Sequence, residues 1–145
     1  MKIYKGLFIG NLTSLKEDIN SYANESGLWL LKGSISNTPA NLALHICGNL
    51  KHNIGAVLGN TGYIRNRDAE FSATGVSKQD IISEIDSTIT MIGPVFDSLS
   101  NDDLLKPWPN EFYGEGQNIG SVLFRLIWHL GYHRGQINYH RRLLF

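Results

Sequence analysis

The chain has 145 residues, with 13 Lys plus Arg and 13 Asp plus Glu, so its formal net charge is zero. This balance argues against a general nucleic-acid binder and a polybasic membrane-surface protein, because both need an excess of cations. Hydrophobic residues make up 42% of the chain and charged residues 18%, which is typical of a globular protein. The lone cysteine, Cys47, excludes an internal disulfide and a multi-cysteine metal site.

The N-terminus resembles a signal peptide only superficially. Lys2 and Lys5 precede an apolar run that is interrupted at Gly10, and no small-residue cleavage site follows. No stretch of the chain is long and apolar enough to span a bilayer. We therefore expect one domain over residues 1–145 of a cytoplasmic protein, with no membrane partner.

Two helices are predicted in the first part of the chain. Apolar residues from Phe8 to Tyr22 recur at alternating intervals of four and three, and Gly27 is expected to end this helix. A second helix is expected to begin at Thr38, because a threonine followed by proline is typical of a helix N-terminus. The glycine-rich turn at residues 59–62 is expected to end it.

Two more helices follow. Ser77 can cap the third helix, with Asp80 three residues later as in a capping box. Gly93 and Pro94 lie inside its apolar pattern and predict a kink or a break, because proline removes a backbone hydrogen bond. The fourth helix is expected to run from about Asn118 to the C-terminus.

Long connections separate these helices at residues 60–76 and 101–117. Plain up-and-down bundles have short connections, so loops of this length usually cross a bundle or form a site. We predict an all-α fold, a four-helix bundle with long crossover connections.

Three of the histidines form a candidate metal site. His129 and His133 lie one turn apart on the fourth helix, both at the edge of its apolar stripe, with Cβ atoms about 5–6 Å apart. His45 lies on the flank of the second helix's inner face, and packing of the two helices can bring it to that pair. Three neutral imidazoles would leave an ion an open position, as in catalytic zinc sites. The residues alone leave a plainer interpretation open, in which these histidines are only hydrogen-bonded.

Other polar residues lie near these histidines in the sequence. Asn49, His52, Gln136 and His140 can orient a ligand or line a pocket, and capping, packing or surface roles are equally compatible with their positions. A zinc protease is disfavoured because Leu130, not glutamate, follows the first histidine of the pair.

The motif around the histidine pair resembles that of a known family. The segment His129-Leu-Gly-Tyr-His133-Arg-Gly-Gln136, with His45 upstream, resembles the DinB/YfiT-like superfamily of damage-inducible four-helix bundles. The helix order, the second helix led by Pro39 and the turn at residues 101–104 are also similar. Residues 65–71 resemble a subgroup of unassigned function.

This resemblance implies a bundle with parallel second and third helices joined by the long crossover. It implies a divalent ion, typically nickel or zinc, held by His45, His129 and His133. It also implies a homodimer and a small-molecule substrate. Members with assigned activity are mostly thiol-dependent S-transferases that use a low-molecular-weight thiol such as bacillithiol, mycothiol or glutathione.

Three functions follow as hypotheses: a metal-dependent thiol S-transferase, a metal-dependent hydrolase, and a non-catalytic stress-related metal-binding bundle. Arg65 and Arg67 can hold the carboxylate of a small thiol, or they are solvated loop charges. The sequence does not identify a catalytic residue. The available bases are His52, Asp68, Glu70 and Glu111. Nucleic-acid binding is not expected.

Overall fold

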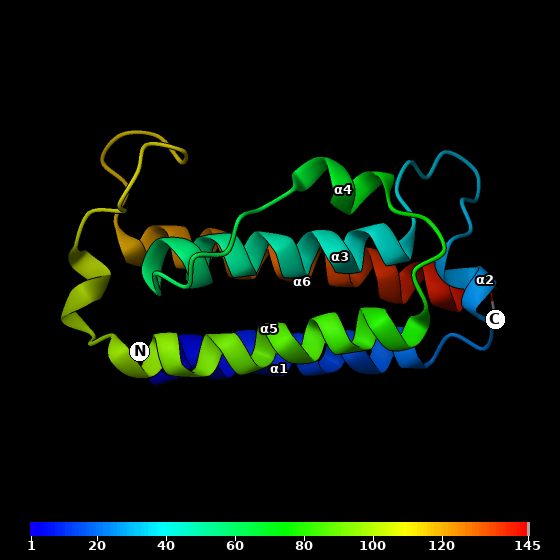
Figure 1. The fold of residues 1–145 in the computed structure, drawn as a ribbon, viewed down its shortest axis with the longest axis horizontal. Coiled ribbons are helices and arrows are strands. Elements are labelled where there is room, and N and C mark those ends of the chain that lie inside the picture. The colour runs from blue at the N-terminus through cyan, green and yellow to red at the C-terminus, as the bar shows by residue number, and fades with distance from the viewer. Residues whose placement is uncertain (145) are drawn as a thin grey trace.

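Four long helices form a bundle in the computed structural model, which describes residues 1–144 (Figure 1). They are α1 (Lys2–Asn20), α3 (Pro39–Leu50), α5 (Lys78–Ser98) and α6 (Ile119–Leu144). α1 packs mainly against α5 and α6, and α3 packs against the same two helices. The predicted all-α four-helix bundle is confirmed.

The direction of the helices explains the first long connection. α1 and α6 run one way along the bundle, and α3 and α5 run the other way (Figure 1). Because α3 and α5 are parallel, the chain between them must return along the length of the bundle. This crossover carries the short helix α4 (Arg67–Ser72), which lies over α3 (Figure 1). The arrangement is the one that the family resemblance implied.

The apolar stripes of the four helices meet in one core. Phe8 of α1 stacks on Phe96 of α5, with ring centroids 5.5 Å apart. The fully buried side chains come from all four helices; they include Leu12, Leu15, Ile46, Ile81, Ile85, Val122 and Leu130. None of the described helices is long and apolar enough to cross a membrane.

Both predicted helix caps are present. The Thr38 hydroxyl accepts a hydrogen bond from the Asn41 amide at 3.1 Å, and Pro39 occupies the first turn of α3. The Ser77 hydroxyl accepts from the Asp80 amide at 3.0 Å and donates to the Asp80 carboxylate at 2.7 Å. Each cap satisfies backbone N–H groups that have no partner within the helix.

One predicted helix end is wrong, and of the kink or break expected at Pro94 the break does not occur. α1 ends at Asn20, and Gly27 lies inside a separate short helix, α2 (Glu25–Leu28). At this end the Ser21 amide still bonds to the Glu17 carbonyl, but the Tyr22 amide bonds to the Ile19 carbonyl three residues back, so the α-helical pattern stops. α5 continues through Pro94 without the expected break. Proline costs that helix one backbone hydrogen bond, and the buried residues on either side of it still pack into the core.

Short helices fill parts of the two long connections. α4 lies in the first, and the 3-10 turn η2 (Asp102–Leu105) lies in the second. The second loop is closed at its base by two backbone bonds, from the Trp108 amide to the Gln117 carbonyl and from the Ile119 amide to the Lys106 carbonyl. Neither short helix has the apolar repeat that revealed the long ones.

α3 does not end at Leu50 but continues as a π-helical segment, η1 (Lys51–Leu58). It closes with a bond of 2.9 Å from the Gly59 amide to the Ile54 carbonyl. A Cβ at Gly59 would lie 2.4 Å from Val95 Cγ2, so glycine allows this end to approach α5. The expected end near Gly59 is confirmed, and the π-helical geometry is an addition to it.

Removing the cap of α3 should measurably destabilise the fold. Thr38→Ala should lower the free energy of unfolding by about 0.5–2 kcal/mol, because it leaves the Asn41 amide without its acceptor. Urea denaturation of the metal-free protein measures this. Thr13→Ala, on the exposed side of α1, is the control and should change stability by less than about 0.5 kcal/mol. Equal effects of the two substitutions would contradict the capping role.

Candidate metal centre

Three histidine rings from two helices meet between α3 and α6. His45 Nε2 lies 3.0 Å from His129 Nε2, and His133 Nε2 lies 3.1 Å from the same atom. The ligand atoms of the three rings all lie within 4.8 Å of one another. Because α3 and α6 are antiparallel (Figure 1), residues more than eighty positions apart reach one point.

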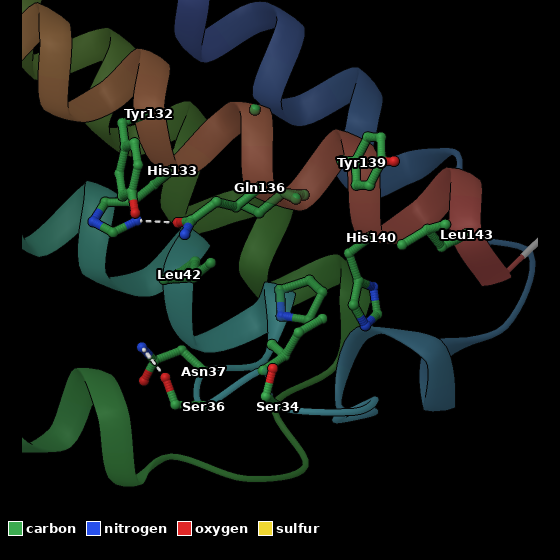
Figure 2. Close-up of a pocket in the computed structure, with 14 residues that line it drawn as sticks. Ser34, Ser36, Asn37, Leu42, Tyr132, His133, Gln136, Tyr139, His140 and Leu143 are labelled. Carbon is green, nitrogen blue, oxygen red and sulfur yellow. Dashed lines mark hydrogen bonds between the residues drawn. The ribbon is translucent and has the colours of Figure 1, made fainter.

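The outer nitrogens of two rings have hydrogen-bond partners that fix the rings. His45 Nδ1 donates to Glu70 Oε2 at 2.8 Å, and His133 Nδ1 donates to Gln136 Oε1 at 2.7 Å (Figure 2 draws the latter). An imidazole that donates from Nδ1 carries its lone pair on Nε2. Both rings therefore direct a lone pair toward His129 Nε2.

This donor set fits a divalent metal ion. His129 Nε2 can donate a proton to only one of the two lone pairs that face it, so hydrogen bonding alone leaves the cluster incomplete. Nitrogens bound to one ion at 2.0–2.1 Å in a tetrahedral arrangement lie about 3.3 Å apart, close to the spacing found here. His45, His129 and His133 can therefore hold a metal ion.

Burial keeps His129 and His133 neutral. Burial and, to a lesser extent, the nearby His133, His45 and Arg65 together lower the pKa of His129 to about 4. Burial also lowers the pKa of His133. Neutral imidazole is the form that binds a metal, so no proton has to be displaced from these two rings near pH 7.

Glu70 of α4 fixes the His45 side of the centre. Its carboxylate accepts from Arg65 Nε at 2.7 Å and from an Arg65 terminal nitrogen at 2.8 Å, besides the bond from His45. Burial alone would raise the pKa of Glu70, but the bonds from His45 and Arg65 outweigh burial, and the pKa is lowered. Glu70 is therefore a carboxylate with both oxygens engaged, and it is not free to act as a base.

Gly48 makes room for that carboxylate on α3. A Cβ at this position would lie 2.1 Å from Glu70 Oε1, a distance at which the glutamate would have to move. Phe71, the residue after Glu70, packs on the His45 ring with centroids 4.7 Å apart. The crossover thus covers one side of the His45 ring, and His45 is buried.

The remaining predicted site residues have separate environments. Gln136 orients His133, as expected of a residue next to a ligand. The described residues provide no hydrogen-bond partner for the buried atoms Asn49 Oδ1 and His52 Nδ1. His140 lies at the far end of α6, where its ring bonds to the Tyr22 hydroxyl and the Leu30 carbonyl, both at 3.0 Å.

The candidate anion-binding arginines are engaged by the protein itself. Arg65 is paired with Glu70, and the Arg67 guanidinium lies over the Phe71 ring at 5.0 Å. Asp68 and Glu111 are exposed. Cys47 is buried, and burial raises the pKa of its thiol to about 12, so it does not supply a thiolate.

Sequence reasoning missed how Glu70 is used, although it named this residue as a possible base. Gly48 and Phe71 were not singled out at all. Gly48, Glu70 and Phe71 come together only in the folded chain, because the crossover returns along the bundle and places α4 over α3. No periodicity within residues 60–76 indicates which of its acidic side chains turns inward.

A helical bundle with a three-histidine site that can bind a metal ion defines the class of this protein. The family model "Protein of unknown function (DUF1572)" matches residues 9–144, so the chain belongs to the DUF1572 family, which is DinB-like. Comparisons with curated proteins and with solved structures give no match. Membership of a particular DinB/YfiT subgroup stays a prediction.

Neutralising Glu70 should weaken metal binding. Glu70→Gln keeps the shape of the side chain but removes the charge that supports the His45 ring, so we expect metal affinity to fall by about 10–100-fold. Competition with a chromophoric chelator measures this. Asp68→Asn, two residues away on the exposed side of α4, is the matched control and should keep wild-type affinity. Equal affinities of all three proteins would contradict the orienting role.

The metal-free protein should lose stability as the pH falls from about 6.5 towards 4. The pKa of an unfolded histidine is about 6.5, whereas that of folded His129 is about 4. The unfolded chain therefore binds the proton first, so this stability is complete above pH 6.5 and declines as the pH approaches 4.

Urea denaturation at several pH values between 7.5 and 4.5 measures this loss. The variant His129→Asn lacks the titrating ring, so it should lose less stability over the same range. Parallel stability curves for the two proteins would show that His129 is not the group responsible.

Proposed function

We propose that this protein is a divalent-metal-dependent enzyme acting on small molecules, most specifically a thiol-dependent S-transferase. One observation carries the proposal: three imidazoles from two helices converge, and only three protein ligands are present in this cluster among the described residues. Sites with three protein ligands and an open position are typical of catalytic zinc centres, whereas structural centres have four.

The two sides of the centre differ in accessibility, and this difference supports the proposal. Glu70, Arg65 and Phe71 enclose His45, so no outside molecule can approach from α4. His129 and His133 are only partly buried, which leaves an approach from the side of α6. Glu70 and Gln136 hold their rings in place and thereby keep the lone pairs directed inward.

Nickel and zinc are the ions we propose, because imidazole nitrogen suits both. Such an ion would supply Lewis acidity that lowers the pKa of a thiol or a water molecule at neutral pH. The chain's own contribution is to keep three imidazole donors at one point and to keep the Glu70 carboxylate bonded to His45. The low-molecular-weight thiol and the second substrate would come from solution.

The proposed activity predicts conjugation that requires both metal and thiol. Protein purified without a polyhistidine tag and loaded with zinc or nickel should conjugate glutathione, bacillithiol or mycothiol to a small electrophile such as chlorodinitrobenzene. Replacing His45 or His133 with alanine should abolish both metal content and turnover, since each removes a ligand. Metal analysis and chromatography of the conjugate measure these effects.

His52→Gln is the control, because His52 is not part of the cluster, and it should keep one ion per chain. Ester hydrolysis that does not depend on thiol would instead favour the hydrolase hypothesis. Bound metal without turnover on any substrate would favour the non-catalytic metal-binding bundle. Absence of metal from every preparation would contradict all three.

We also propose a homodimer formed through the exposed face of α6. Phe124, Trp128 and Tyr132 lie one turn apart on this face and are 67%, 65% and 53% exposed, and the last two rings stack with centroids 5.7 Å apart. Rows of exposed aromatic side chains are rare on monomers and common at interfaces. Light scattering of the purified protein gives its mass and decides between one chain and two.

A further inference from the structure

A groove of about 760 Å³ runs along α6 beside the metal centre (Figure 2). One wall is formed by α6 from Tyr132 to Leu143, and the opposite wall by the loop Ser34–Asn37 that leads into α3. His133, a candidate ligand, lies at one end. From there the groove extends over ten residues of α6, which is about 15 Å at 1.5 Å per residue.

Among the residues that the structure describes, none of those lining the groove is an aspartate, glutamate, lysine or arginine. It contains two histidines, but His133 bonds to Gln136 and His129, and His140 bonds to Tyr22 and Leu30. Neither ring therefore offers an unengaged N–H to an anion, and a charged ligand would lose its hydration without gaining a partner.

The lining instead combines apolar side chains with neutral hydrogen-bonding groups. Pro39, Leu42 and Ile137 provide apolar surface between the two walls, and Tyr132 and Tyr139 stand at the side of α6. Neutral polar groups from the loop and from Gln136 face the same space (Figure 2). Pockets of roughly 300–1,000 Å³ with such a lining suit drug-sized organic molecules.

We propose that this groove binds an uncharged, elongated organic molecule with an apolar body, whose reactive end lies at His133. This assignment deepens the proposed function, because it makes the neutral second substrate, rather than the charged thiol, the occupant of the groove. The ion pair between Arg65 and Glu70 agrees with this assignment. It keeps the Arg65 charge on the other side of the centre, away from the groove.

Two related dyes test the charge preference directly. N-phenyl-1-naphthylamine is neutral, and 8-anilino-1-naphthalenesulfonate has the same ring system with an added sulfonate. Fluorescence titration of the folded protein should show the neutral dye binding at least about tenfold more tightly, a difference of about 1.4 kcal/mol. Equal binding, or tighter binding of the sulfonate, would overturn the assignment.

Two glycines on α6 locate the binding site. Gly135 lines the groove and Gly131, one turn earlier, does not, and a Cβ at either position meets no atom within 4 Å. Gly135→Leu should therefore fold normally, fill the groove and weaken binding of the neutral dye by at least about tenfold. Gly131→Leu adds the same side chain outside the groove and should leave dye binding within about twofold of wild type. Equal effects of both variants would place the dye elsewhere.

A gain of function completes the test. Gly135→Lys adds a cation to the groove and should shift the preference towards the sulfonate dye, whereas Gly131→Lys should not. An unchanged preference in Gly135→Lys would overturn the assignment. These measurements need neither metal nor turnover, so they can fail while the metal-dependent activity stands, and the reverse also holds.

Discussion

The buried contact between Glu70 and His45 is the interaction on which the site depends. A carboxylate inside a helical bundle loses its hydration, which is a large cost unless charged and hydrogen-bonding partners surround it. Arg65 and His45 supply those partners, and Gly48 leaves the space in which the carboxylate can lie against α3. The same contact ties the crossover to α3 and sets which nitrogen of His45 faces α6. Glu70 therefore holds the long connection against α3 and fixes the tautomer of His45. By fixing that tautomer it also directs His45 Nε2 toward the two histidines of α6.

The topology of the bundle determines where that convergence occurs. A bundle with short loops would make α3 and α5 antiparallel and would leave no chain over α3. Here the parallel arrangement sends residues 59–77 back along the bundle, and α4 lies over α3 (Figure 1). Glu70 and Phe71 of α4 then contact His45. The opposite direction of α6 then brings His129 and His133 to the same level. The length of the connection and the position of the metal site are two consequences of one arrangement.

The parts of this structure that could be predicted are those whose signals are local. Thr38 and Ser77 predict where their helices begin, because a hydroxyl just before a helical repeat can accept from an N–H group that has no partner within the helix. The helical angle of 100° per residue places His129 and His133 together, because one helix positions both. The break that Pro94 could have caused does not occur, because tertiary packing outweighs one lost hydrogen bond. The role of Glu70 could not be read, since it depends on contacts with residues 5 and 25 positions away.

The two sides of the three-histidine cluster differ in the partners that hold its rings. On the side of α4, the charges of Glu70 and Arg65 are paired with each other, and the aromatic ring of Phe71 lies against His45. On the side of α6, Gln136 fixes His133 with a neutral bond, so the ring is held without adding a charge next to the groove. A carboxylate in the place of Gln136 would support the ring equally well, but it would repel anions and bind cations at the mouth of the centre. The enclosed ring thus has a charged partner and the partly exposed ring a neutral one. This difference is the one expected if an outside molecule approaches from the side of α6, as we propose.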